Sequence, residues 1–173
     1  YPKYKLYYWL CILFGSRKQI FLTFAPWVMV TTFHRNTQTI AMLLTIGAVI
    51  GIVYQPWLGR AIDRFGEKKI LAAEAVTVVF VCAGYGLSKQ FFSEDTAFYI
   101  AAFCYIVDQM LMSVGMARTT YLKKIAEDKS HIKPTLSMAI TLDHIFSIGI
   151  AVAGGAVWAM TDYKWVFLAG AGI

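Results

Sequence analysis

The sequence predicts an all-α membrane protein, and three features support this class. Hydrophobic residues make up 58% of the chain and charged residues only 15%, which is far from the balance of a soluble domain. The apolar residues fall in long runs, and residues 37–59 carry no formal charge at all. Short polar segments separate these runs, and two of these segments are rich in Lys and Arg. Together these features predict a bundle of six transmembrane helices, the last of them incomplete.

Three of the predicted helices, residues 37–58, 70–88 and 96–117, match the length that crosses a hydrocarbon core of roughly 30 Å at about 1.5 Å per residue. The first is longer, so it needs a tilt or a break. In the fifth, Pro134 fits the first helical turn, where a missing N–H costs little. The sequence starts at Tyr1 and stops inside an apolar run, so we expect a fragment of a longer protein. The predicted helices cover residues 6–33, 37–58, 70–88, 96–117, 134–160 and 165–173 of this single unit, 1–173.

The composition argues against several other classes of protein. The net charge of +6 does not indicate nucleic-acid binding, because the basic residues alternate with apolar spans instead of clustering on one soluble face. The three cysteines lie within apolar runs without metal-ligand spacing, so neither a disulfide framework nor a metal site is expected. We find no phosphate-binding glycine loop and no nucleophile triad. We therefore expect no cofactor and no enzymatic activity.

The distribution of Lys and Arg predicts the orientation. Eleven of these residues lie in the amino-terminal segment, the second connection and the fourth connection, and three lie in the other connections. Positively charged connections stay on the cytoplasmic side. We therefore expect a multi-pass protein of the plasma (inner) membrane with a cytoplasmic amino end.

A dense charged segment, residues 59–69, joins the second and third predicted helices. Gly66 permits a tight reversal there, and Asp63 can lie near the positive end of a helix dipole. Gly59 allows another backbone to approach closely. The fixed positions of the segment are Gly59, Asp63, Arg64, Gly66, Lys68 and Lys69.

This spacing resembles the loop signature of the major facilitator superfamily of secondary transporters, G-x-x-x-D-[RK]-x-G-x-[RK]-[RK]. The resemblance implies that the chain is one six-helix half of a twelve-helix fold, and the basic approach to the first helix favours the carboxy-terminal half. It also implies that the first and fourth helices line a central cavity. Asp63 and Arg64 would close the cytoplasmic side by docking onto the opposite half. The expected partners are that missing half or a second copy, the lipid bilayer and a small solute.

Ionisable residues lie near the middle of three predicted helices. Arg17 and Lys18 are about sixteen Å into the first helix, Asp108 lies in the fourth, and Asp143 and His144 lie in the fifth. A charge facing lipid at this depth costs about 3 kcal/mol or more. Two interpretations remain: structural ion pairs, or a transport pathway with a shared solvated cavity. His144 is either a proton carrier or a packing residue. Glu74, close to the end of the third helix, is interpreted as a snorkelling or loop-paired carboxylate.

Small residues mark predicted contacts between helices. Gly47, Gly51 and Gly59 recur at steps of four with Gln55, and Gly154 ends a stripe of small and polar residues on the fifth helix. Such ridges allow helices to approach closely. We interpret them as packing positions.

The predicted function is secondary active transport of a small solute by alternating access, with H⁺ as the expected coupling ion. The basic residues at the centre suggest an anionic solute, unless the aspartates neutralise them. Alternatives are a non-transporting membrane subunit or sensor and, more remotely, an intramembrane aspartyl protease, whose sequence flanks do not occur here.

Overall fold

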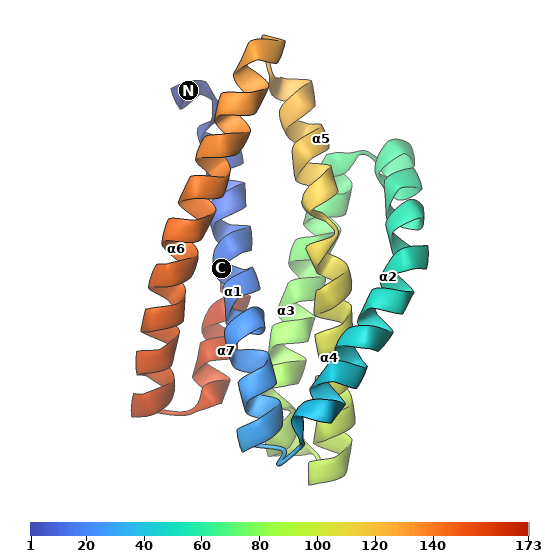
Figure 1. Cartoon of the computed structure of the whole chain (residues 1–173), viewed down its shortest axis with the longest axis vertical. Helices are drawn as coiled ribbons and strands as arrows, with labels where there is room; N and C mark the ends of the chain where they lie inside the picture. Colours follow the sequence, from blue (N-terminus) through green and yellow to red (C-terminus); the bar gives the residue numbers. More distant parts are fainter. Residues whose placement is uncertain (173) are drawn as a thin grey trace.

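The computed structural model describes residues 1–172, which fold into a bundle of α-helices (Figure 1). The helices alternate in direction along the chain, except that α5 continues the course of α4. No β-strand occurs in residues 1–172, so the all-α class is confirmed. The elements are η1 (Pro2–Tyr4), α1 (Lys5–Thr31), α2 (Thr37–Phe65), α3 (Glu67–Phe91), α4 (Glu94–Met112), α5 (Gly115–Ile125), η2 (Lys129–His131), α6 (Ile132–Met160) and α7 (Tyr163–Ala171).

Four helical segments of the described chain are long and apolar enough to cross a membrane: Thr37–Phe65, Glu67–Phe91, Glu94–Ile125 and Lys129–Met160. The long helix α1 is not among them, and it carries Arg17 and Lys18 in its middle. The helix α7 has nine residues. Length and composition thus support four of the six predicted spans.

Several predicted boundaries differ from the structure. The predicted connection 59–69 is helical except at Gly66, because α2 runs to Phe65 and α3 begins at Glu67. The predicted helix 96–117 is interrupted at Ser113 and Val114. The fifth predicted helix begins two residues before Pro134, directly after η2. In the last predicted helix, 165–173, α7 is described to Ala171 and residue 173 lies outside the described residues.

The interruption between α4 and α5 is a short stretch of tighter turns. The amides of Ser113 and Val114 donate to the carbonyls of Met110 and Leu111, three residues back. Such bonds replace the usual bonds to the fourth preceding residue and tighten the backbone. The helix therefore changes geometry between Asp108 and the start of α5 without reversing its direction.

The main core runs through α1, α2, α3, α4 and α7. Where α1, α3 and α7 meet, three fully buried rings pack together: the Tyr85 and Phe167 centroids are 4.6 Å apart, and Phe21 lies edge-on to both. The Tyr85 hydroxyl donates to the carbonyl of Ala25 at 2.7 Å. This bond satisfies a polar group that burial would otherwise penalise. A smaller core of Tyr4, Tyr7, Leu122 and Ala139 joins η1, α1, α5 and α6.

The helix α1 is the central element, because it packs against α6 and α7 and also contacts α2, α4 and α5. By contrast, α2 and α6 leave apolar side chains uncovered. Val53 and Ile52 on α2 are 75% and 74% exposed, and Val152 on α6 is 71% exposed. Exposed apolar faces of this kind suit contact with lipid or with another apolar surface.

The connections divide between the two ends of the bundle. The amino end, the α2–α3 turn and the α5–α6 connection lie at one end, and the α1–α2, α3–α4 and α6–α7 connections lie at the other (Figure 1). The three basic segments predicted to share one side of the membrane therefore lie at the same end of the molecule.

Candidate functional site

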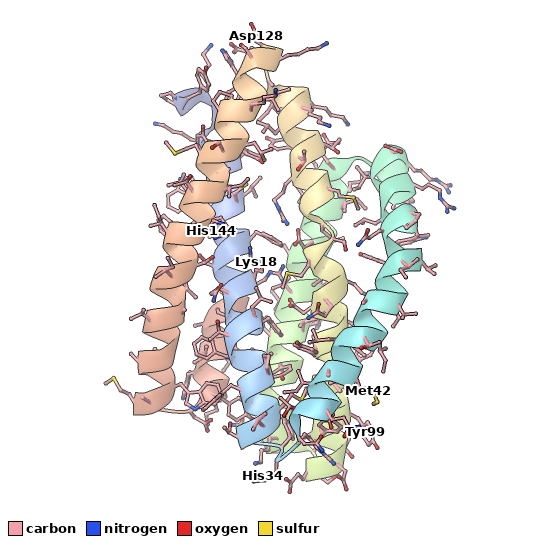
Figure 2. All side chains as sticks on the ribbon, in the orientation of Figure 1. Lys18, His34, Met42, Tyr99, Asp128 and His144 are labelled. Atoms are coloured by element: carbon pink, nitrogen blue, oxygen red, sulfur yellow. The ribbon has the colours of Figure 1, made fainter. Side chains whose placement is uncertain are left out.

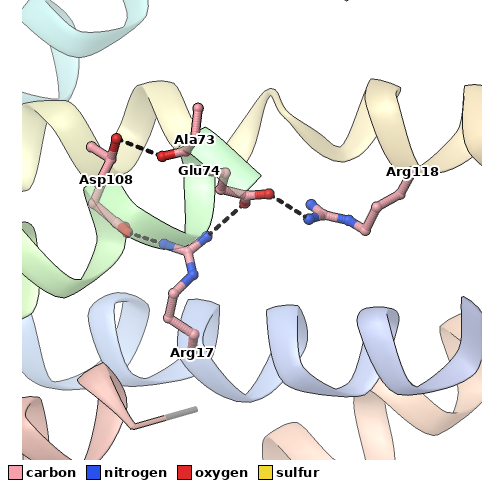
Figure 3. A network of polar contacts seen from close by, with 6 residues as sticks. Arg17, Ala73, Glu74, Asp108 and Arg118 are labelled. Atoms are coloured by element: carbon pink, nitrogen blue, oxygen red, sulfur yellow. Dashed lines mark hydrogen bonds and ion pairs between the residues drawn. The ribbon is translucent and has the colours of Figure 1, made fainter. Parts of the chain in front are cut away.

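Four charged side chains from four helices meet inside the bundle, and we refer to Arg17, Glu74, Asp108 and Arg118 as the buried charge cluster (Figure 3). Arg17 of α1 donates to Asp108 of α4 at 2.6 Å and to Glu74 of α3 at 3.5 Å. Arg118 of α5 donates to the other oxygen of Glu74 at 2.9 Å. The cluster is thus a continuous chain of ion pairs across the bundle.

The cluster is almost completely removed from solvent. Exposure is 5% for Arg17, 7% for Glu74, 1% for Asp108 and 6% for Arg118. An isolated charge at such a position is strongly unfavourable, and two cations with two anions compensate one another. Removing one member of such a pair typically costs about 3–5 kcal/mol, because the remaining charge is left buried.

Phe14, one turn before Arg17 on α1, supports both guanidinium groups. The Cζ atom of Arg118 lies 3.4 Å from the ring centroid of Phe14, and that of Arg17 lies 5.1 Å from it. Stacking on an aromatic face stabilises a guanidinium group through the ring quadrupole. The ring therefore holds Arg118 of α5 against α1.

A second ion pair connects α1 and α6. Lys18 donates to Asp143 at 3.1 Å, and both side chains are more exposed than the cluster, at 25% and 16%. The helices approach closely here: a Cβ atom on Gly15 would overlap Oδ1 of Asp143, and the Ser147 hydroxyl donates to the Gly15 carbonyl at 3.2 Å. Among residues 1–172, that Oδ1 atom is buried without a hydrogen-bond partner.

The structure brings the predicted midplane residues together in two separate groups. Arg17 pairs with Asp108, and Lys18 pairs with Asp143. Successive residues of a helix point about 100° apart, so the two aspartates lie on different sides of α1. His144 is exposed on α6 and belongs to neither pair; Figure 2 labels it together with Lys18.

For two members of the buried charge cluster, the position in the structure differs from the one that the sequence pattern suggests. Glu74 was expected to snorkel or to pair with a loop, and Arg118 was counted among the basic residues of a connection. Both are buried and paired with each other. Glu74 shares a face of α3 with Val78, Val81 and Tyr85 at steps of three and four. That spacing is a possible signal, although α3 is apolar on both faces and the pattern alone does not identify the inner one.

Residues of the signature segment lie at the end of the bundle that holds the amino terminus. Gly66, at φ 84° and ψ 152°, is the single non-helical residue between α2 and α3, and its amide donates to the Ile62 carbonyl at 2.9 Å. Four of the charged positions, Asp63, Arg64, Lys68 and Lys69, are exposed. The buried Glu67 accepts from Lys124 of α5 at 2.6 Å, which ties this turn to α5.

The predicted packing glycines have different surroundings. A Cβ atom on Gly154 would contact the Phe24 ring at 2.6 Å, and one on Gly47 would lie 3.4 Å from Gln109. A Cβ atom on Gly51 or Gly59 would meet no described atom within 4 Å. Within residues 1–172, Gly51 and Gly59 are therefore not positions of close packing, and their contact with another helix stays a prediction.

Two cavities lie beside these elements. One, of about 280 Å³, is lined by α1, α3, α5 and the end of α7 and includes Arg17, Glu74 and Arg118. The other, of about 450 Å³, lies between α2 and α4 and is lined by Gly47, Gly51, Gln55, Gln109 and neighbouring residues. No group of three or more His, Cys, Asp or Glu side chains that could hold a metal occurs in the described part of the chain.

One exposed ion pair links the amino-terminal segment to the α5–α6 connection. Lys3 donates to Glu127 at 2.7 Å. This hydrogen bond lowers the pKa of the Glu127 carboxyl group and raises the pKa of Lys3. Both side chains are more than half exposed, so the pair positions the amino end more than it stabilises the fold.

Comparison with known proteins adds no family assignment. No family model, no curated protein and no solved structure matches this chain. The functional proposal therefore rests on the buried charges and on the helices that carry them.

Proposed function

We propose that this protein is a secondary active transporter that moves a small solute across a membrane by alternating access, coupled to H⁺. The observation that carries the proposal is the buried charge cluster. Its members come from α1, α3, α4 and α5, and α3 and the α4–α5 segment are long and apolar enough to cross a membrane. Ionisable groups inside a membrane-spanning bundle commonly mark substrate and ion pathways.

The cluster suits a reaction cycle because its pairs share partners. Arg17 contacts both Asp108 and Glu74, so a change in the charge of either carboxylate alters the balance of hydrogen bonds at the other. Proton binding to a carboxylate would release a guanidinium group to a new partner. A rearrangement of this kind would couple proton binding to the relative positions of α1, α3 and α4.

Membership in the major facilitator superfamily is part of the proposal and is supported by the signature spacing of residues 59–69. In this view the chain acts with a second six-helix half or a second copy, which would cover the exposed apolar faces of α2 and α6. Asp63 and Arg64, which are exposed, would dock on that partner. The proposed location is the plasma (inner) membrane with the amino end in the cytoplasm.

Reconstitution tests this function. The purified chain is placed in liposomes at high and low protein density, a pH gradient is imposed, and uptake of labelled carboxylates, sugars and amines is followed with internal pH. We expect solute accumulation that depends on the gradient and is lost in Asp108→Asn. Glu94→Gln, at an exposed carboxylate in the first turn of α4, should behave as the wild type. Proton-driven uptake that is unchanged in Asp108→Asn would remove this residue from the mechanism.

A non-transporting membrane subunit or sensor is the second candidate, and the completeness of the ion pairs favours it. Both oxygens of Glu74 accept a hydrogen bond from an arginine, as in a purely structural cluster. Solute binding without flux at either protein density would support this alternative.

An intramembrane aspartyl protease requires two facing aspartates. Asp108 and Asp143 pair with adjacent residues on different sides of α1, and this arrangement gives no support for that activity. We propose no enzymatic role.

A further inference from the structure

The larger of the two cavities, of about 450 Å³, lies between α2 and α4 and has a polar but uncharged lining. Its polar groups are the carboxamides of Gln55 and Gln109 and the hydroxyl group of Ser113, and the other described residues around it are apolar or glycine. None of the described lining residues has an ionisable side chain. Sites for small molecules have volumes of about 300–1,000 Å³ and combine apolar walls with a few polar groups. The cavity has the size and the composition of such a site.

Both carboxamides belong to helical segments that are long and apolar enough to cross a membrane, Thr37–Phe65 and Glu94–Ile125. Gln55 is exposed, and Gln109 is half-buried. Polar side chains in such segments are unfavourable in contact with lipid, and they commonly line a cavity or pair with other polar groups. A carboxamide carries two N–H donors, one carbonyl acceptor and no charge. The two glutamines therefore favour a neutral partner that both donates and accepts hydrogen bonds.

The backbone of α4 supplies a further acceptor at the same cavity. The Ser113 amide donates to the carbonyl of Met110 at 3.0 Å, three residues back, whereas in a regular α-helix it would donate to that of Gln109. The Gln109 carbonyl therefore loses its regular donor, and both Gln109 and Ser113 line the cavity. Irregular backbone within a membrane-spanning segment is tolerated where it lines a water-filled cavity or is buried in protein, and interrupted helices commonly form the solute sites of transporters. The interruption thus points to this cavity independently of the side chains.

Two glycines of α2 leave the space open. A Cβ atom on Gly51 would meet no described atom within 4 Å, and one on Gly47 would lie 3.4 Å from Cβ and Cγ of Gln109. The aliphatic part of Gln109 therefore packs against Gly47, while the space beside Gly51 stays free. Leu44 and Met112 add apolar contacts to the lining. The cavity is suited to a molecule that has polar edges and an apolar face.

The lack of charge determines which solute fits. An ionised solute would lose its hydration without gaining an ion-pair partner, because the four charges of the buried charge cluster compensate one another and line no part of this cavity. An apolar solute would leave the carboxamides without partners. Each hydroxyl group of a polyhydroxyl compound both donates and accepts hydrogen bonds, and the C–H face of such a compound packs on apolar side chains.

We propose that the cavity between α2 and α4 binds a neutral polyhydroxyl solute of about the size of a monosaccharide, held by hydrogen bonds to Gln55, Gln109 and Ser113. This inference rests on the proposed transport function, of which it names the solute class. Asp108 of the buried charge cluster directly precedes Gln109, so the solute and the cluster contact the same turn of α4. A shift of this turn would link solute binding to the ion pair of Asp108 without placing a charge in the cavity.

Binding to the full chain in lipid nanodiscs, measured by calorimetry, tests the solute class. The neutral probes are glucose and myo-inositol, and the charged analogues are glucuronate and protonated glucosamine. We expect glucose or myo-inositol to bind, and each charged analogue to bind at least about tenfold more weakly than the tighter of the two, because its charge is desolvated without a partner. Binding of neither neutral probe, or binding of a charged analogue as tightly as the neutral one, would overturn the proposal.

A substitution that fills the cavity tests where the solute binds. In Gly51→Leu the new side chain enters the free space beside α2, so binding should weaken at least about tenfold while the unfolding midpoint stays unchanged. The matched control is Gly149→Leu, at an exposed glycine of α6 where a Cβ atom also meets no described atom within 4 Å. This position lies outside the cavity, so the control should bind as the wild type. Undiminished binding by Gly51→Leu would place the solute elsewhere and contradict the assignment.

The carboxamides are tested separately, because their replacement by leucine suits a membrane helix and preserves the side-chain size. Gln55→Leu and Gln109→Leu should each weaken binding of the neutral probe by roughly tenfold, since each removes hydrogen bonds to the solute. Their unfolding midpoints should match that of the wild type. A folded double variant Gln55→Leu/Gln109→Leu that binds as the wild type would refute the role of both residues.

Reconstitution separates this inference from the transport function. Binding of glucose or myo-inositol that is lost in Gly51→Leu, without flux into liposomes, would support the site and refute transport. Proton-driven uptake of a carboxylate or an amine that an excess of both neutral probes leaves unchanged would support transport and refute the site. Uptake of the neutral probe that is lost in Gly51→Leu would support both.

Discussion

At Arg17, a single guanidinium group holds two carboxylates from different helices. Its Nη1 and Nη2 atoms contact Asp108 and Glu74, respectively. A planar group with several fixed donors can make both contacts at once, whereas a lysine ammonium is a compact point charge. The identity of this residue therefore determines how α1, α3 and α4 are joined.

Removing the carboxylate of Asp108 should destabilise the fold. In Asp108→Leu, Arg17 stays buried with only the 3.5 Å contact to Glu74, so we expect a loss of about 3 kcal/mol in the free energy of unfolding. The double variant Arg17→Met/Asp108→Leu removes both charges and should recover part of that loss. Unfolding in detergent, followed by circular dichroism, measures both variants. Equal losses in the single and double variants would show that the loss in Asp108→Leu does not come from the unpaired charge of Arg17.

The close approach of α1 and α6 at Gly15 gives a second prediction. In Gly15→Ala the new methyl group overlaps the Asp143 carboxylate, so either the Lys18–Asp143 pair breaks or α6 shifts. Overpacking of this kind typically costs about 1–3 kcal/mol. The matched control is Gly51→Ala in α2, where a Cβ atom meets no described atom within 4 Å, and which should be neutral or gain up to about 1 kcal/mol. Similar unfolding midpoints for the two variants would contradict this account.

The sequence identified the partners Arg17, Lys18, Asp108 and Asp143 because each interrupts an apolar run. It did not identify Arg118, which is followed by a polar and basic segment and therefore resembles the start of a connection. In the structure that segment is helical as part of α5, and Arg118 stacks on Phe14. A contact between residues so far apart in the chain leaves no local pattern, so it was not predictable.

At the scale of the elements, the α2–α3 turn depends on Gly66. Its φ of 84° with ψ of 152° lies in a region that is essentially restricted to glycine. Gly66→Ala should therefore cost about 1–3 kcal/mol in the free energy of unfolding. Gly59 is another signature position, and a Cβ atom there meets no described atom within 4 Å. Gly59→Ala should therefore leave the free energy of unfolding unchanged. Thermal unfolding of the two variants measures the difference. A neutral Gly66→Ala would show that the turn adopts another conformation.

The helix boundaries show which elements a pattern can predict. The starts of α2 and α4 were predicted within two residues, because polar residues precede both: Asn36 caps α2 by accepting from the Thr39 amide, and Ser93 precedes α4. The break at Ser113–Val114 was not predicted, because serine and glycine are common in membrane helices and do not by themselves end one. The sequence predicts that the second helix ends at residue 58, because the charged residues that follow are interpreted as a connection. In the structure α2 continues to Phe65. Charged residues continue a helix readily at the edge of a membrane.

At the scale of the molecule, buried charged side chains and exposed apolar side chains lie on different parts of the bundle. Charged residues are buried around α1, whereas apolar residues are exposed along α2 and α6. In water this distribution would be unfavourable, and in a bilayer it is the expected one. The helix α1, which carries Arg17 and Lys18, is not among the four segments that are long and apolar enough to cross a membrane, and it still occupies the centre of the bundle.

The orientation of the bundle can be tested by labelling single cysteines. Lys129 in η2 and Lys68 at the start of α3 belong to the end that also holds the amino terminus, and Lys89 lies near the opposite end, where it donates to the Thr32 carbonyl. Each is replaced by Cys in a variant whose Cys11, Cys82 and Cys104 are changed to Ser.

Because positively charged segments stay in the cytoplasm, an impermeant maleimide should label Lys68→Cys and Lys129→Cys only in inside-out vesicles, and Lys89→Cys only in right-side-out vesicles. Labelling of all three in the same preparation would rule out a bundle that crosses the membrane, and the reversed pattern would place the amino end outside. Permeabilised vesicles, in which all three should react, provide the control for accessibility.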